Sequence, residues 1–133
     1  MTLKVRVVIA DDQQNVRESL KGLLPIMTVD GDGAAGPRIE IVGEASDGES
    51  AVRIVAQCQP DVVLMDVRMA GMDGLQATRI IKARWPEVRV VILTLFAGQR
   101  GTALAAGADA FLLKGCSPEI LARTIHGSES EMT

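Results

Sequence analysis

The segment DVVLMDVRMAGMDG, residues 61–74, carries the pattern on which the fold prediction depends. Its run Val62–Met65 is apolar at consecutive positions, as expected of a strand that is covered on both faces. Asp66 follows this run directly, and Asp73 stands where an N-cap would begin the next helix. A buried strand, an acidic turn and a helix start in one segment predict a strand–helix unit of a parallel sheet.

Four more apolar runs of this kind recur along the chain, at Val5–Ala10, Ile39–Val42, Val88–Leu93 and Ala110–Leu113. Helical patterns separate these runs, and we expect helices up to Pro25, over residues 47–58, 73–85 and 99–106, and from Ser117 onward. The helix over 99–106 should be short, because Gly98 and Gly101 lie at its start. Five strands alternating with five helices predict an α/β fold, a doubly wound five-stranded parallel sheet with right-handed crossovers.

The chain has 133 residues, which suits one domain, expected over residues 1–126 with 127–133 as a polar tail or the start of a linker. Hydrophobic residues make up 47% and charged residues 23%, a balance that excludes a disordered chain. The Gly- and Asp-rich stretch 27–38 is expected to form a surface loop at the end of the sheet opposite Asp66.

The net charge of −3 argues against direct nucleic-acid binding by this chain, because such binding needs clustered cations. No apolar run approaches the roughly 18 residues needed to span a membrane. We therefore expect a soluble, cytoplasmic protein. The single histidine, His126, falls at the end of the last helix, where we expect a surface residue with no part in the chemistry.

Polar residues stand at the carboxyl ends of four predicted strands. Asp11 and Asp12 follow the first strand, Asp66 the third, Thr94 the fourth and Lys114 the fifth. Each has an ordinary explanation when taken alone, such as an N-cap, a solvated turn or a surface charge. Together they can converge only if the first strand lies beside the third, as in a sheet of order 2-1-3-4-5, where ligands bind at this edge.

The chemistry of such a group follows from its charges. Three carboxylates at close range repel one another, so Asp11, Asp12 and Asp66 favour a hard divalent cation, Mg²⁺ by preference. An aspartate beside such an ion can act as a nucleophile toward phosphorus. The Lys114 ammonium and the Thr94 hydroxyl would then stabilise the phosphoryl oxygens, so we take Asp66, Lys114 and Thr94 as the catalytic set.

Five segments of the chain resemble the receiver domains of two-component response regulators, most closely the LuxR-type (NarL/FixJ) transcriptional regulators. They are VVIADDQQNVRESLKGLL (7–24), IVGEASDGESAV (41–52), DVVLMDVRMAGMDGLQAT (61–78), VVILTLF (90–96) and AGADAFLLKG (106–115). The resemblance implies the flavodoxin-like (CheY-like) fold. It also implies a switch rather than an enzyme, with self-catalysed phosphoryl transfer and autodephosphorylation only.

The resemblance further assigns roles to individual residues. Asp66 would accept a phosphoryl group from a sensor histidine kinase. Mg²⁺ would be bound by Asp12, Asp66 and the main-chain carbonyl of Arg68, with Asp11 acting partly through water.

Two further residues, Thr94 and Phe111, would form the switch pair, with Phe111 turning inward on phosphorylation. Partners or a second copy of the chain would dock on the fourth helix, fifth strand and fifth helix, or on another helix face, to control an output such as transcription.

Some positions depart from the family pattern. Ala70 and Gly115 replace prolines that family members commonly have, which predicts more flexible loops after the third and fifth strands. The stretch 94–107 is shorter than usual, so the geometry of the fourth helix is expected to differ, and the 27–38 loop is longer than usual.

Other readings of the same residues stay open. A haloacid-dehalogenase-like phosphatase would need a second acid two residues after its nucleophile, where Arg68 stands. A flavodoxin-type FMN carrier would surround its phosphate with hydroxyls and amides, whereas Asp11 and Asp12 would repel it. A degenerate receiver would dock partners without phosphorylation. A receiver could also act alone, as a single domain, or belong to a longer transcription factor with a DNA-binding domain.

Overall fold

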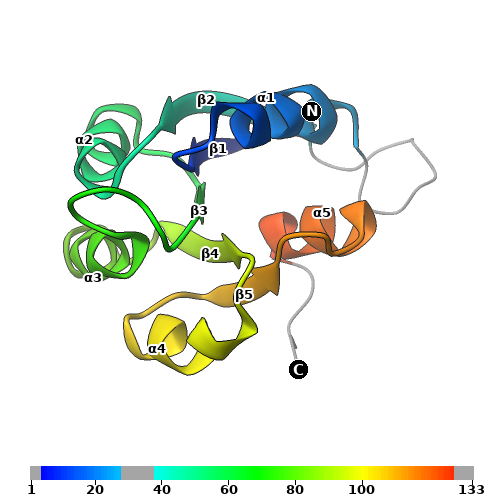
Figure 1. Cartoon of the computed structure of the whole chain (residues 1–133). Helices are drawn as coiled ribbons and strands as arrows, with labels where there is room; N and C mark the ends of the chain where they lie inside the picture. The colour runs from blue at the N-terminus through cyan, green and yellow to red at the C-terminus, as the bar shows by residue number, and fades with distance from the viewer. Residues whose placement is uncertain (1–3, 28–37, 128–133) are drawn as a thin grey trace.

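A computed structural model describes residues 4–27 and 38–127 of the chain, and Figure 1 shows a central sheet with helices on both sides. The sheet contains the strands β1 (Lys4–Ala10), β2 (Arg38–Ala45), β3 (Val62–Met65), β4 (Arg89–Thr94) and β5 (Ala110–Leu113). All four strand pairs are parallel, and the order is β2-β1-β3-β4-β5. The predicted flavodoxin-like topology is therefore confirmed.

Within these described residues, five α-helices accompany the strands, as predicted. They are α1 (Gln14–Leu23), α2 (Gly48–Cys58), α3 (Gly74–Arg84), α4 (Arg100–Ala105) and α5 (Pro118–His126). One apolar cluster joins α2, α3 and α4 to one face of the sheet, and a second joins α1 and α5 to the other face. Burial on both faces explains why β3 is apolar at every position, since all its residues are buried.

The predicted helix starts rest on side-chain caps. Asp47 accepts a hydrogen bond from the Ser50 amide, and Ser117 accepts one from the Ile120 amide. Asp73 caps α3 through a reciprocal bond with Gln76, which satisfies two amides that the helix itself leaves unpaired. These local signals explain why the helix boundaries could be predicted within a few residues.

Some boundaries differ from the prediction. Strand β2 continues to Ala45 rather than ending at Val42, because Gly43 and Glu44 also pair with β1 although neither continues the apolar run. The chain after α1 makes a 3-10 turn over Leu24–Ile26. Helix α4 is short, as expected, and a 3-10 turn over Ala97–Gln99 precedes it.

The expected surface position of His126 is wrong in one respect. Both ring nitrogens are buried and have no hydrogen-bond partner within the described part of the chain. The last turn of α5 lies against the start of β4, where Arg89 Nε donates to the Thr124 carbonyl oxygen at 3.1 Å. This contact joins the end of α5, which carries His126, to the sheet.

The predictions for the loop over 27–38 and for the tail fall almost wholly outside the described residues. Among the helices that the structure describes, none has the length and apolar character required to cross a bilayer.

Candidate functional site

The carboxyl ends of β1 and β3 place two acids side by side. Ala10 pairs with Met65 in the sheet, and the next residue of each strand is Asp11 and Asp66. The Asp66 amide donates to the Ala10 carbonyl oxygen at 2.9 Å, which extends the pairing by one residue. Both side chains are buried, with 3% and 7% of their surfaces exposed. The sheet itself therefore holds two carboxylates next to each other in a place with little water.

Asp12 completes a cluster of three acids. One carboxylate oxygen from each of Asp11, Asp12 and Asp66 lies within 4.8 Å of the other two. Asp12 is exposed, so the cluster opens to solvent on its side. Three carboxylate oxygens in a cluster that is open to water match the preference of Mg²⁺, which binds a few carboxylates and keeps several of its waters. The donor set therefore fits a hard divalent cation, as the sequence predicted.

Lys114 lies within this cluster. Its Nζ is 2.8 Å from Asp11 Oδ2 and 3.4 Å from Asp66 Oδ2. Burial alone would lower the pKa of Lys114, but the two carboxylates outweigh it and the pKa is raised. Lys114 is therefore a cation at neutral pH, and it partly offsets the repulsion between the two acids.

Asp66 experiences opposing influences. Burial and the negative charge of Asp11 raise the pKa of Asp66, while Lys114 and the Val67 amide act in the opposite direction. The Val67 amide donates to Asp66 Oδ1 at 2.9 Å, whereas Oδ2 faces Lys114. The carboxylate is thus held in one orientation and has a net upward shift in its pKa. A positive charge nearby favours its ionised form.

Thr94, at the end of β4, is fully buried, and its main-chain oxygen accepts a 2.7 Å bond from the Lys114 amide. Its hydroxyl donates to Gln99 Oε1 at 3.1 Å. Phe111 of β5 is 5% exposed and belongs to the core cluster that includes α4. The described structure therefore places both predicted switch residues in the interior, one on each of two adjacent strands.

Arg68 follows β3 by three residues and is exposed. Its guanidinium lies over the Phe96 ring, 4.0 Å from the ring centroid. This contact links the loop after β3 to the loop after β4, on the side of the sheet where the acids lie.

Three residues at this edge were not singled out from the sequence. Gln99 accepts the Thr94 hydroxyl bond, Arg17 binds the Asp11 carbonyl oxygen, and Gly74 packs against the Asp66 carbonyl oxygen so closely that a Cβ would overlap it. Only Gly74 had a sequence signal, since it follows the N-cap Asp73 in a Gly-Met-Asp-Gly turn. The other two contacts depend on how separate elements meet.

Comparison with protein families supports the resemblance noted in the sequence. The model of the response regulator receiver domain matches residues 7–126. The uncharacterised transcriptional regulatory protein YhcZ of Bacillus subtilis is 38% identical over 133 residues, which cover 97% of this chain and 58% of that protein. The transcriptional regulatory protein LiaR of Bacillus subtilis is 38% identical over 112 residues, covering 83% of this chain and 49% of LiaR. The chain spans about half the length of these curated relatives.

Solved structures share the fold over nearly the whole chain. The receiver domain of the response regulator NarL from Mycobacterium tuberculosis has a TM-score of 0.82 at 30% identity, covering 98% of this chain and 99% of that one. A LuxR-family DNA-binding response regulator from Staphylococcus aureus has a TM-score of 0.78 at 30% identity, covering 92% and 97%.

Proposed function

Because this chain belongs to the response regulator receiver domain family, we propose that it is the phosphoryl-accepting switch of a two-component signalling system. Asp66 is the acceptor in this proposal. The observation that carries it is the position of Lys114, whose ammonium lies 2.8 Å from Asp11 and 3.4 Å from Asp66, within a cluster of three acids. An ammonium and three carboxylates thus lie at one sheet edge, which supports these roles.

The acids would hold Mg²⁺ in the proposed site. Asp12, Asp66 and the main-chain carbonyl of Arg68 would be its protein ligands, and Asp11 would act partly through water. When bound, the ion neutralises charge on the phosphoryl oxygens. The geometry of the three carboxylates, whose oxygens lie within 4.8 Å of one another, supports this assignment.

Phosphoryl transfer at this site needs little rearrangement of covalent bonds. An Asp66 carboxylate oxygen forms a bond to the phosphorus of a phosphohistidine on the kinase. The phosphorus–nitrogen bond breaks and its electron pair returns to the ring nitrogen. The imidazole, which is protonated on its other nitrogen, leaves as a neutral group, and an acyl phosphate replaces the carboxylate. Lys114 supplies positive charge to the phosphoryl oxygens, and the Thr94 hydroxyl supplies a hydrogen bond. The chain thus accepts the phosphoryl group and catalyses its own modification. This is the role of a switch rather than of an enzyme that turns over a substrate.

In this proposal, phosphorylation changes the packing of two residues, Thr94 on β4 and Phe111 on β5. Thr94 moves toward the phosphoryl group, and Phe111 repacks in the space released. The surface of α4, β5 and α5 then docks partners or a second copy of the chain. The full-length relatives are named transcriptional regulators, so we propose transcription as the output, through a DNA-binding domain outside these residues, and a cytoplasmic location.

The test is labelling with acetyl phosphate and Mg²⁺. The wild type should gain one acid-labile phosphoryl group, seen by intact-mass spectrometry, and Asp66→Asn should gain none. Equal labelling of the two proteins would place the acceptor elsewhere. An unlabelled wild type, also with its kinase, would contradict the proposal and favour a receiver that acts without phosphorylation.

A further inference from the structure

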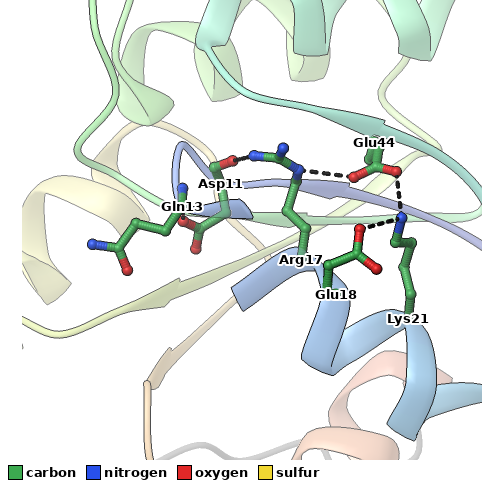
Figure 2. Close-up of polar contacts among 6 residues, drawn as sticks. All are labelled: Asp11, Gln13, Arg17, Glu18, Lys21 and Glu44. Atoms are coloured by element: carbon green, nitrogen blue, oxygen red, sulfur yellow. Dashed lines mark hydrogen bonds and ion pairs between the residues drawn. The ribbon is translucent and has the colours of Figure 1, made fainter. Parts of the chain in front are cut away.

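The Arg17 side chain joins the backbone of Asp11 to helix α1 and strand β2. From α1, its Nη1 donates to the main-chain oxygen of Asp11 at 2.6 Å, and its Nε pairs with Glu44 Oε1 of β2 at 2.8 Å (Figure 2). Only 15% of the Arg17 side chain is exposed, against 37% of the Glu44 side chain, so the Arg17 end of the bridge is shielded from much of the solvent. Ion pairs and hydrogen bonds of this kind are stronger than those on an open surface.

The bonds around Asp11 fix the backbone on both of its sides. The Asp11 amide donates to the Ala45 carbonyl oxygen at 3.0 Å, which orients the peptide plane before Asp11. The Asp11 carbonyl belongs to the rigid plane that joins Asp11 to Asp12, and Arg17 orients that plane. The Arg17 bond thus holds the peptide plane from which Asp12 follows, together with the bond from the Gln13 amide to Asp11 Oδ1 at 2.9 Å.

Glu44 holds Arg17 in this position. Its Oε1 binds Arg17, and its Oε2 binds Lys21 Nζ at 2.7 Å, as Figure 2 shows. Hydrogen bonds from Lys21 and Arg17 lower the pKa of Glu44, so this carboxylate is charged at neutral pH. Lys21 also pairs with Glu18 at 2.9 Å within α1. Lys21 thus shares Glu44 with Arg17. Its own contacts are to Glu44 and Glu18, whereas Arg17 also contacts Asp11.

We propose that Arg17, held by Glu44, is a positioning residue that aims the Asp12 carboxylate at the bound divalent cation. This inference rests on the proposed function, since it assumes that Asp12 is a metal ligand. In this inference, a residue outside the acid cluster influences the affinity of the site for the divalent cation. Partners that orient metal ligands commonly change metal affinity by 10- to 100-fold when they are removed.

Charge and position predict opposite effects for the loss of Arg17. Its guanidinium is a cation next to Asp11, one of the three acids, so its removal would strengthen Mg²⁺ binding if charge alone mattered. If Arg17 orients Asp12, its removal weakens Mg²⁺ binding instead. The sign of the change in the dissociation constant for Mg²⁺ therefore distinguishes an effect of charge from an effect of orientation.

The experiment compares Arg17→Gln with Lys21→Gln in the whole chain, with Mg²⁺ binding measured by calorimetry at fixed ionic strength. Both variants lose one positive charge from α1 and one ion pair to Glu44, but only Arg17→Gln loses the bond to the Asp11 carbonyl. We expect the dissociation constant for Mg²⁺ to rise about tenfold in Arg17→Gln. In Lys21→Gln it should stay the same or fall.

A second variant, Arg17→Lys, keeps the inference testable if Arg17→Gln fails to fold. It keeps the charge, but a single ammonium cannot reproduce the planar fork that binds Asp11 and Glu44 together, so its Mg²⁺ binding should also weaken. Phosphorylation rates should recover at saturating Mg²⁺ in both Arg17 variants, since the acceptor Asp66 is unchanged. Equal Mg²⁺ affinities for Arg17→Gln and Lys21→Gln, beside a wild type that binds and is phosphorylated, would overturn this inference alone. A wild type that fails to bind Mg²⁺ would overturn the proposed function.

Discussion

The Lys114 ammonium binds Asp11 Oδ2 at 2.8 Å, closer than the 3.4 Å that separates it from Asp66 Oδ2. The shorter contact is thus to a proposed metal ligand and the longer one to the proposed phosphoryl acceptor. Because Asp11 is 3% exposed, little solvent is available to stabilise its charge if this contact is lost. A divalent cation bound in the proposed site would offset the charge of the same acids as Lys114 does. The loss of Lys114 should therefore destabilise the protein less when such a cation is bound.

We predict that Lys114→Met destabilises the protein and that Mg²⁺ recovers part of the loss. Without Mg²⁺, the substitution leaves two buried carboxylates without their cation, which should lower the free energy of unfolding by about 3 kcal/mol. Mg²⁺ should stabilise the variant more than the wild type, since it meets no competing ammonium. Urea unfolding with and without Mg²⁺ measures both effects.

The control for Lys114 is Lys82, another partly buried lysine. It pairs with Asp109 at 2.9 Å on a different part of the molecule. Lys82→Met should also destabilise the protein, but Mg²⁺ should not restore its stability. The same response to Mg²⁺ in the two variants would contradict the interpretation of the Lys114 site.

The hydrogen bond from Thr94 to Gln99 should oppose switching. Thr94 has one hydroxyl proton, which it donates to Gln99 Oε1 at 3.1 Å, and it cannot also donate it to a phosphoryl group. A hydrogen bond of this kind is worth about 1 kcal/mol. We predict that Gln99→Leu increases the ratio of switched to unswitched molecules about fivefold after phosphorylation, as measured by NMR.

A double-mutant cycle checks this explanation. In a Thr94→Val background the hydroxyl is absent, so Gln99→Leu should have no further effect on the ratio. An unchanged effect of Gln99→Leu in that background would mean that Gln99 acts through some contact other than the Thr94 hydroxyl.

Features that depend on neighbours along the chain could be predicted from the sequence. The apolar runs predicted the strands, and Asp47, Asp73 and Ser117 predicted the helix starts, since a cap and its amide lie within three residues. The polar residues at the ends of the first, third, fourth and fifth strands predicted which side chains gather at one edge, because parallel strands share that edge.

Features that depend on distant residues could not be predicted in this way. Arg17 meets Glu44 across 27 positions of sequence, and no local pattern indicates that pairing. The burial of the His126 ring nitrogens was missed for the same reason, since a polar residue at a helix end is usually solvated.

Gly74 should be required for the position of Asp66. A Cβ at residue 74 would overlap the Asp66 carbonyl oxygen, and the Gly74 amide donates to the Val67 carbonyl oxygen at 2.8 Å. We predict that Gly74→Ala lowers the free energy of unfolding by about 2 kcal/mol and slows labelling by acetyl phosphate. The control Gly101→Ala lies in α4 with no atom within 4 Å of its Cβ, so it should raise stability by about 0.5 kcal/mol. Normal labelling of a folded Gly74→Ala would contradict this role.

The buried ring nitrogens of His126 should make the protein less stable in mild acid. Burial lowers the pKa of His126 below its ordinary value of 6.5. The unfolded chain then binds the proton more readily than the folded one. Stability is therefore complete above the ordinary value and is lost as pH falls through it. We expect urea unfolding to show a drop in stability from pH 7.5 to 5.5 that is smaller in His126→Leu.

Comparing the wild type with His126→Leu isolates this effect from the carboxylates. The raised pKa of Asp66 has the opposite sign, since the folded state then binds its proton more readily and gains stability in acid. Asp66 is present in both proteins, so its contribution cancels in the difference between them. The difference should grow by at most about 1.4 kcal/mol for each pH unit below the ordinary histidine value. Parallel pH profiles for the two proteins would show that the imidazole is protonated equally in the folded and unfolded chains, and that its burial carries no energetic consequence.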